Sequence, residues 1–80
     1  MENYDINIIG DRIYELRNEN NWSQEELANK LMIDKQKIVR YETHHSIPEA
    51  DMIVMLSKIF NTSTDYLIGV TEKRKKFPKK

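Results

Sequence analysis

The stretch that decides the fold is Trp22–Glu42, WSQEELANKLMIDKQKIVRYE, which is typical of two short helices separated by about three residues. Ser23 is a favoured helix N-cap, and Glu26 three residues later completes a capping box for the first helix. Residues 32–34 interrupt the pattern, and the carboxylate of Asp34 can cap a second helix that follows at once. Because so short a connection does not favour an antiparallel pair, we expect the helices to cross steeply as a helix-turn-helix.

Apolar residues at helical spacing mark the buried side of both helices. They are Leu27, Ala28, Leu31, Ile33, Ile38 and Tyr41. The outward side of the second helix is left with Lys35, Gln36, Lys37, Val39 and Arg40. In a DNA major groove, lysine and arginine can bind guanine and glutamine can bind adenine, so this side is a candidate reader of duplex DNA. The alternative is a solvated helix face, which is the usual role of a polar stripe.

Three further helices are predicted around this block. Apolar residues spaced by three and four from Ile8 onward predict a first helix. Pro48, which is favoured in the first turn of a helix, predicts a fourth helix that runs to about Phe60. Ser63 is placed to cap a short fifth helix, which Gly69 would end. No segment alternates like a strand, so we expect an all-α, compact five-helix domain whose short helices are stable only when packed.

The composition limits the chain to one small domain. Eighty residues leave room for a single core, and the absence of cysteine excludes disulfide scaffolds and thiolate metal sites. The longest apolar run, residues 52–56, is too short to span a membrane. Residues 1–10 carry acids where a signal peptide needs positive charge. We therefore expect a cytoplasmic protein with no membrane partner.

The net charge of zero hides a basic C-terminus. Six of the last eight residues are basic, and they are Lys73, Arg74, Lys75, Lys76, Lys79 and Lys80. Residues 1–72 therefore hold 7 basic and 13 acidic side chains, a net charge of −6. We expect residues 1–70 to form the domain and residues 71–80 to form a disordered tail. In the alternative, the tail lies along DNA phosphates and steepens the salt dependence by about 0.9 log units per neutralised phosphate.

A series of short motifs follows in a fixed order and spacing from Ile9 to Gly69. They are Ile9-Gly10-Asp11-Arg12-Ile13, Leu16-Arg17, Trp22–Ala28, Ile38, Tyr41-Glu42, Pro48, Leu56, Phe60 and Asp65–Gly69. In these motifs the sequence resembles the lambda-repressor-like helix-turn-helix DNA-binding proteins, also called the xenobiotic-response-element class. Met32 and His44 stand where that family usually has glycine. Both positions often need a left-handed backbone, which costs a residue with a side chain about 1–2 kcal/mol.

The resemblance implies a role for several groups of residues. The base contacts would come from Lys35, Gln36 and Arg40. The phosphate contacts would come from Gln24, Lys37, Thr43, His44, His45 and Ser46. The resemblance also implies a structural ion pair between Arg17 and Glu42, which would fix the angle between the first and third helices.

The fifth helix is too short to bury all of its apolar side chains. Tyr66, Ile68 and Val70 are therefore candidates for a dimer interface. We expect a transcriptional regulator, a repressor, that binds an inverted-repeat site in double-stranded DNA as a homodimer, with the helix at about 35–42 in the major groove. The alternative is a protein-interaction module of the same fold, which would bind a partner regulator or enzyme through its acidic surface.

Nothing in the sequence indicates an enzyme, a cofactor or a metal site. Neighbouring His44 and His45 lack the spacing to converge on a metal, and no carboxylate or thiolate partner is evident. Caps and loops account for Ser23, Asp34 and Ser46, because no nucleophile elbow or glycine-rich phosphate loop accompanies them.

Overall fold

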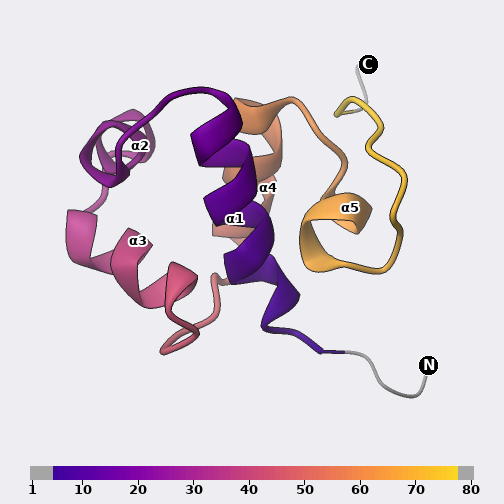
Figure 1. Cartoon of the computed structure of the whole chain (residues 1–80), viewed down its shortest axis with the longest axis horizontal. Coiled ribbons are helices and arrows are strands. Elements are labelled where there is room, and N and C mark those ends of the chain that lie inside the picture. The colour runs from indigo at the N-terminus through magenta and orange to yellow at the C-terminus, as the bar shows by residue number, and fades with distance from the viewer. Residues whose placement is uncertain (1–4, 78–80) are drawn as a thin grey trace.

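The computed structural model describes residues 5–77. Its helices are α1 (Ile8–Glu19), α2 (Gln24–Leu31), α3 (Lys35–Glu42), α4 (Ala50–Phe60) and α5 (Thr64–Ile68). α1 and α4 lie in the middle, with α2 and α3 on one side and α5 on the other (Figure 1). The described residues contain no strand, so the prediction of an all-α, five-helix domain is confirmed. None of the helices between residues 5 and 77 is long and apolar enough to cross a bilayer.

The predicted caps are present at three helix starts. The Ser23 hydroxyl accepts from the Glu26 backbone N–H, and the Glu26 carboxylate accepts from the Ser23 N–H. The Asp34 carboxylate accepts from the Gln36 N–H, and Ser63 caps α5 in the same manner. Each cap satisfies backbone donors that the first turn of a helix leaves free, so the starts of α2, α3 and α5 are locally determined.

The start of α4 differs from its prediction. Pro48 was expected in the first turn, whereas the helix begins at Ala50. Glu49 has an extended backbone and occupies the N-cap position, so Pro48 lies just before the helix. Proline forces the residue before it, Ile47, away from helical geometry but leaves Glu49 free to start the helix.

Both positions that depart from the family pattern adopt a left-handed backbone, with φ of 59° at Met32 and 68° at His44. Met32 ends α2, and its side chain is 91% exposed. The turn of the helix-turn-helix therefore forms without glycine and without burying the methionine.

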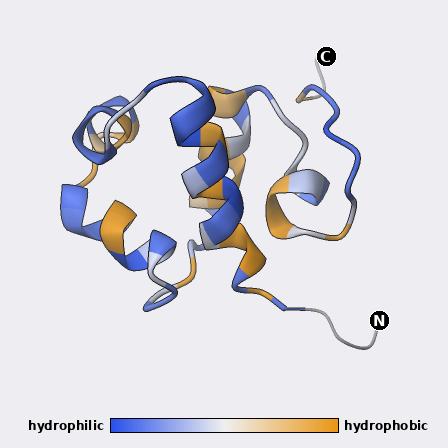
Figure 2. Ribbon diagram, viewed as in Figure 1, coloured by the Kyte–Doolittle hydropathy of each residue, from blue (hydrophilic) through white to orange (hydrophobic). Residues whose placement is uncertain are grey.

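The core lies where the five helices meet. Leu27, Ala28, Leu31, Ile38 and Tyr41 are buried as predicted, while Ile33 is only partly buried against them. On α4 the buried residues are Leu56, Ser57 and Phe60. Every helix carries both hydrophilic and hydrophobic residues, as helices around a shared core must (Figure 2).

Gly10 lies where α1 packs closely against the end of α3. A Cβ atom added there would lie 2.1 Å from the Tyr41 carbonyl oxygen, which is a backbone atom and cannot rotate away. We expect Gly10→Ala to lower the free energy of unfolding by about 1–3 kcal/mol, because overpacking outweighs the gain in helix propensity. Urea unfolding followed by the fluorescence of Trp22, the single tryptophan, measures the change. Asn18→Ala, at an exposed position of α1, is the control, and equal stability of the two variants would contradict the expected clash.

Residues 71–77, part of the segment expected to form a tail, contact the domain at several points. Arg74 donates twice to the Glu19 carboxylate, at 2.6 and 2.8 Å, and once to the Tyr66 hydroxyl. The Lys75 carbonyl accepts from the Ser63 N–H. These contacts hold the segment beside α5, on the side of the molecule away from α3 (Figure 1). Lys79 and Lys80 lie outside the described residues.

The Arg74 hydrogen bonds hold the pKa of Glu19 below its ordinary value. A carboxyl with a lowered pKa stabilises the folded state when it is ionised and stops doing so as the pH falls through that pKa. We therefore expect the tail to be held more firmly at neutral pH than in acid.

Candidate nucleic-acid interface

The outward side of α3 is polar and exposed. Lys35, Gln36, Lys37 and Arg40 are exposed, Val39 is half-buried, and Ile38 and Tyr41 face the core. The side chains of Lys35, Gln36 and Lys37 make no hydrogen bond or ion pair with any residue between 5 and 77. They are therefore free to bind a ligand that approaches this side of α3.

The ion pair implied between Arg17 and Glu42 is present and buried. The Arg17 Nε–H donates to Oε2 of Glu42 at 2.7 Å, and Nη2 donates to Oε1 at 2.9 Å. The two side chains are 10% and 5% exposed. A third donor of Arg17 reaches the Trp22 carbonyl oxygen. The bond to Glu42 raises the pKa of Arg17, and the pair joins α1 to the end of α3.

Gln24, the first residue of α2, is part of the same cluster. Its Nε2 donates to Oε1 of Glu42 at 3.0 Å. A carboxamide has two N–H donors, so one remains for a ligand. Glu42 thereby positions the start of α2 against α3, a contact that the sequence analysis did not predict.

The loop after α3 uses most of its polar atoms internally. The His44 Nε2 lies 2.9 Å from an Asp11 carboxylate oxygen on α1, although both side chains remain exposed to solvent. The His45 Nδ1 lies 2.8 Å from the Thr43 hydroxyl, which itself donates to the Val39 carbonyl oxygen. The Asp11 carboxylate would repel an anion that approaches this ring.

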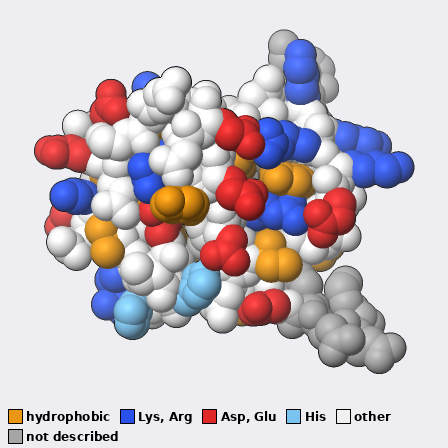
Figure 3. Space-filling model, viewed as in Figure 1, with side chains coloured by type: hydrophobic (Ala, Val, Ile, Leu, Met, Phe, Trp, Pro, Cys, Tyr) orange, Lys and Arg blue, Asp and Glu red, His pale blue; other side chains and the backbone are white. Residues whose placement is uncertain are grey.

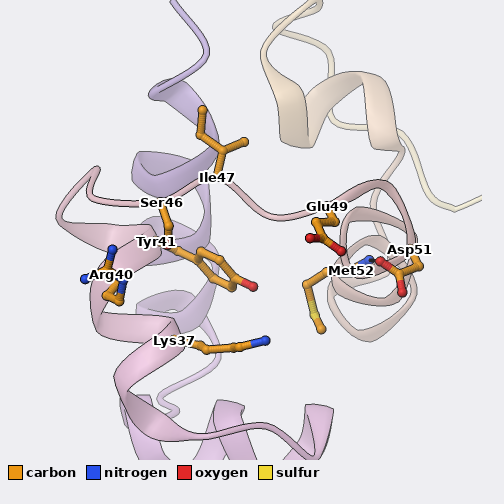
Figure 4. Close-up of a pocket in the computed structure, with 8 residues that line it drawn as sticks. All are labelled: Lys37, Arg40, Tyr41, Ser46, Ile47, Glu49, Asp51 and Met52. Carbon is orange, nitrogen blue, oxygen red and sulfur yellow. Dashed lines mark hydrogen bonds between the residues drawn. The ribbon is translucent and has the colours of Figure 1, made fainter.

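A cleft of about 370 Å³ separates α3 from the start of α4 (Figure 4). Lys37, Tyr41 and Ser46 line one wall, while Glu49 and Asp51 line the other. Burial, and after it the two carboxylates, raises the pKa of the Tyr41 hydroxyl, which stays protonated. The sequence analysis placed Tyr41 in the core and gave no role to the two acids. Only the packing of α4 against α3 brings these groups together.

The acidic surface is not spread evenly. On the face shown in Figure 3, acidic side chains gather over the middle, where α1 lies, and basic side chains gather over the C-terminal segment. Histidines lie at the lower left, near the loop after α3. The net charge of residues 1–72 therefore does not by itself describe the surface around α3.

The predicted dimer residues separate into different environments. Tyr66 is only 6% exposed, since the Arg12 guanidinium lies 3.9 Å from the centre of its ring and Arg74 bonds its hydroxyl. Little of Tyr66 is therefore exposed for contact with a second subunit. Ile68 is half-buried and Val70 is 42% exposed.

On α4, Val54 and Met55 are also exposed, although the sequence analysis did not select them. Between residues 5 and 77 no three acidic or histidine side chains gather as a metal site would require.

The paired helices can be placed in a family by comparison. A family model described as helix-turn-helix matches residues 13–67, which include all of α2 and α3. The chain belongs to the helix-turn-helix family. The similar proteins of this family carry the names of transcriptional regulators.

Three relatives of this helix-turn-helix protein come from Bacillus subtilis (strain 168). The HTH-type transcriptional regulator ImmR is 38% identical over 68 residues, which cover 85% of this chain and 54% of ImmR. The regulator AnsR is 34% identical over 68 residues, covering 85% of this chain and 59% of AnsR. An uncharacterised SPbeta prophage-derived regulator, YonR, is 31% identical over 64 residues, covering 80% of this chain and 59% of YonR. The matched region thus spans little more than half the length of these relatives.

Proposed function

We propose that this chain is a cytoplasmic transcriptional regulator, a repressor, that binds a specific site in double-stranded DNA. The observation that carries the proposal is the exposed polar side of α3, whose first three side chains have no partner between residues 5 and 77. The capped α2–α3 pair and the Arg17–Glu42 bond hold that side in a fixed orientation. A rigid helix with outward donors is suited to enter a major groove.

Two classes of contact follow from this placement. Lys35, Gln36 and Arg40 bind base edges and select the sequence. Phosphate contacts set the position of the protein on the duplex, and they come from Gln24, Lys37, Thr43, His45 and Ser46, with His44 contributing least.

The regulator binds an inverted repeat as a homodimer, so that two copies of α3 enter grooves about 34–36 Å apart. The support for a second subunit is the exposure of apolar side chains that a partner would cover. Val70 next to α5 and Val54 and Met55 on α4 are such side chains.

Selection of bound sites from a random duplex pool tests the proposal. We expect an inverted repeat, and binding that weakens steeply with salt. The second candidate is a protein-interaction module, favoured by the acidic side chains over α1 (Figure 3). Such a module would bind no duplex at low or high salt, and that result would exclude the DNA-binding function.

Gln36→Ala tests the assignment of a base contact. We expect a loss of about 1–3 kcal/mol in binding free energy at the selected site and little change on random duplex, because a bidentate contact to adenine is lost. Fluorescence anisotropy with both duplexes at one salt concentration gives the two values. Asn29→Ala, an exposed amide on α2, is the control. Equal losses on both duplexes would remove Gln36 from sequence selection.

A further inference from the structure

The cleft between α3 and α4 has donors on one wall and carboxylates on the other. From α3, the Lys37 ammonium and the Tyr41 hydroxyl both point toward α4 (Figure 4). Ser46 adds a second hydroxyl to this wall. Glu49 and Asp51 stand opposite, at the start of α4 (Figure 4).

The Tyr41 hydroxyl is a donor without a partner. The residue as a whole is 7% exposed, yet its hydroxyl makes no hydrogen bond to any residue between 5 and 77. Tyrosine hydroxyls on buried rings usually find a partner. The Tyr41 hydroxyl stays protonated and opens into the cleft beside Lys37. A neutral O–H donor next to an ammonium group can bind an anionic oxygen.

We propose that Lys37, Tyr41 and Ser46 form a seat for one phosphate of the DNA backbone, with Tyr41 as its neutral donor. The proposal rests on the DNA-binding function, since a helix in the major groove brings the residues beside it against the sugar–phosphate backbone. Glu49 and Asp51, on the opposite wall, repel the bound phosphate and so lower the affinity of the seat.

Tyr41→Phe removes the hydroxyl and leaves the ring in the core. We expect this full-length variant to bind the selected site and random duplex about threefold to tenfold more weakly, by the same factor for both, because a phosphate contact carries no sequence information. The dependence on salt should be unchanged, since no charge is lost. Tyr14→Phe is the matched control, because Tyr14 is exposed on α1 and does not line the cleft.

Lys37→Gln separates the charged contact from the neutral one. This variant should also weaken binding to both duplexes, but it should reduce the slope of log K against log salt by about 0.9. Glu49→Gln should act in the opposite direction and tighten binding about threefold. Asp65→Asn, which removes an acid from α5, is the control for Glu49→Gln and should have a smaller effect.

The outcomes distinguish the seat from the proposed function. If the wild-type protein binds no duplex, the DNA-binding function fails and the seat fails with it. If the wild type binds while Tyr41→Phe binds equally well, or Glu49→Gln does not exceed its control, the seat alone is wrong. A lower melting temperature of Tyr41→Phe would show that the hydroxyl serves the fold, which also overturns the proposal. Displacement of duplex by inorganic phosphate beyond that by chloride at equal ionic strength would identify a site for free anions instead.

Discussion

Glu42→Ala is expected to lower the free energy of unfolding by about 3–5 kcal/mol, because it leaves the Arg17 guanidinium buried without its counter-ion. Among residues 5–77, Arg17 then keeps its hydrogen bond to the Trp22 carbonyl oxygen and the contact of its guanidinium with the Tyr14 ring. Gln24 also loses the acceptor that fixes its side chain. A small domain is stable by only about 5–15 kcal/mol, so this loss is a large part of the total.

Urea unfolding followed by Trp22 fluorescence measures this loss. The chain supplies a matched control, since Glu19 and Arg74 form a second doubly bonded pair whose side chains are 49% and 43% exposed. Glu19→Gln should change the free energy of unfolding little, because the attraction between two exposed charges scarcely exceeds the hydration that each would have alone. Losses of equal size at the two pairs would show that burial is not what gives the Arg17–Glu42 bond its importance.

A second variant tests whether the pair sets geometry or adds stability. Replacing both partners by apolar residues, Arg17→Met with Glu42→Leu, leaves no buried charge and should restore much of the stability. If the pair fixes the angle between α1 and α3, this double variant should bind DNA more weakly than the wild-type protein even where its free energy of unfolding is restored.

The double variant Lys35→Ala with Arg40→Ala is expected to lose about 2–6 kcal/mol of binding free energy at the selected site. Each bidentate contact to guanine contributes about 1–3 kcal/mol of discrimination, and contacts to separate base pairs add approximately. Both side chains lie on the exposed side of α3, so their removal should leave the fold intact. Anisotropy titrations give the affinity, and the melting temperature checks the fold.

The tail provides the control for charge. Lys73→Ala with Lys75→Ala also removes two positive charges, but from the side of the molecule away from α3 (Figure 1). We expect a small loss that is equal on selected and random duplexes. If the tail variant loses as much as the α3 variant, the binding is general attraction to phosphates, and Lys35 and Arg40 do not select bases.

The sequence by itself determined the features that depend on residues a few positions apart. The capping box of Ser23 and Glu26 and the cap at Asp34 could be predicted, because each is a contact within one turn of chain. The left-handed backbone at Met32 was expected from the family resemblance instead. The buried and exposed sides of α3 followed from helical periodicity for the same reason. The pairing of Arg17 with Glu42 came from the family resemblance, since nothing in the spacing alone joins them.

The tertiary structure decided the other contacts between polar side chains that lie far apart in the sequence. Gln24 meets Glu42, His44 meets Asp11, and Arg74 docks on Glu19 across 55 positions of sequence. Tyr66 is buried because Arg12 and the returning tail cover it, whereas the sequence indicated only that it was a candidate for a dimer interface. Likewise, Tyr41 opens into a cleft only because α4 packs beside α3. The physical reason is that the spacing of residues fixes which side of a helix is apolar, whereas the packing of whole helices fixes which polar groups meet.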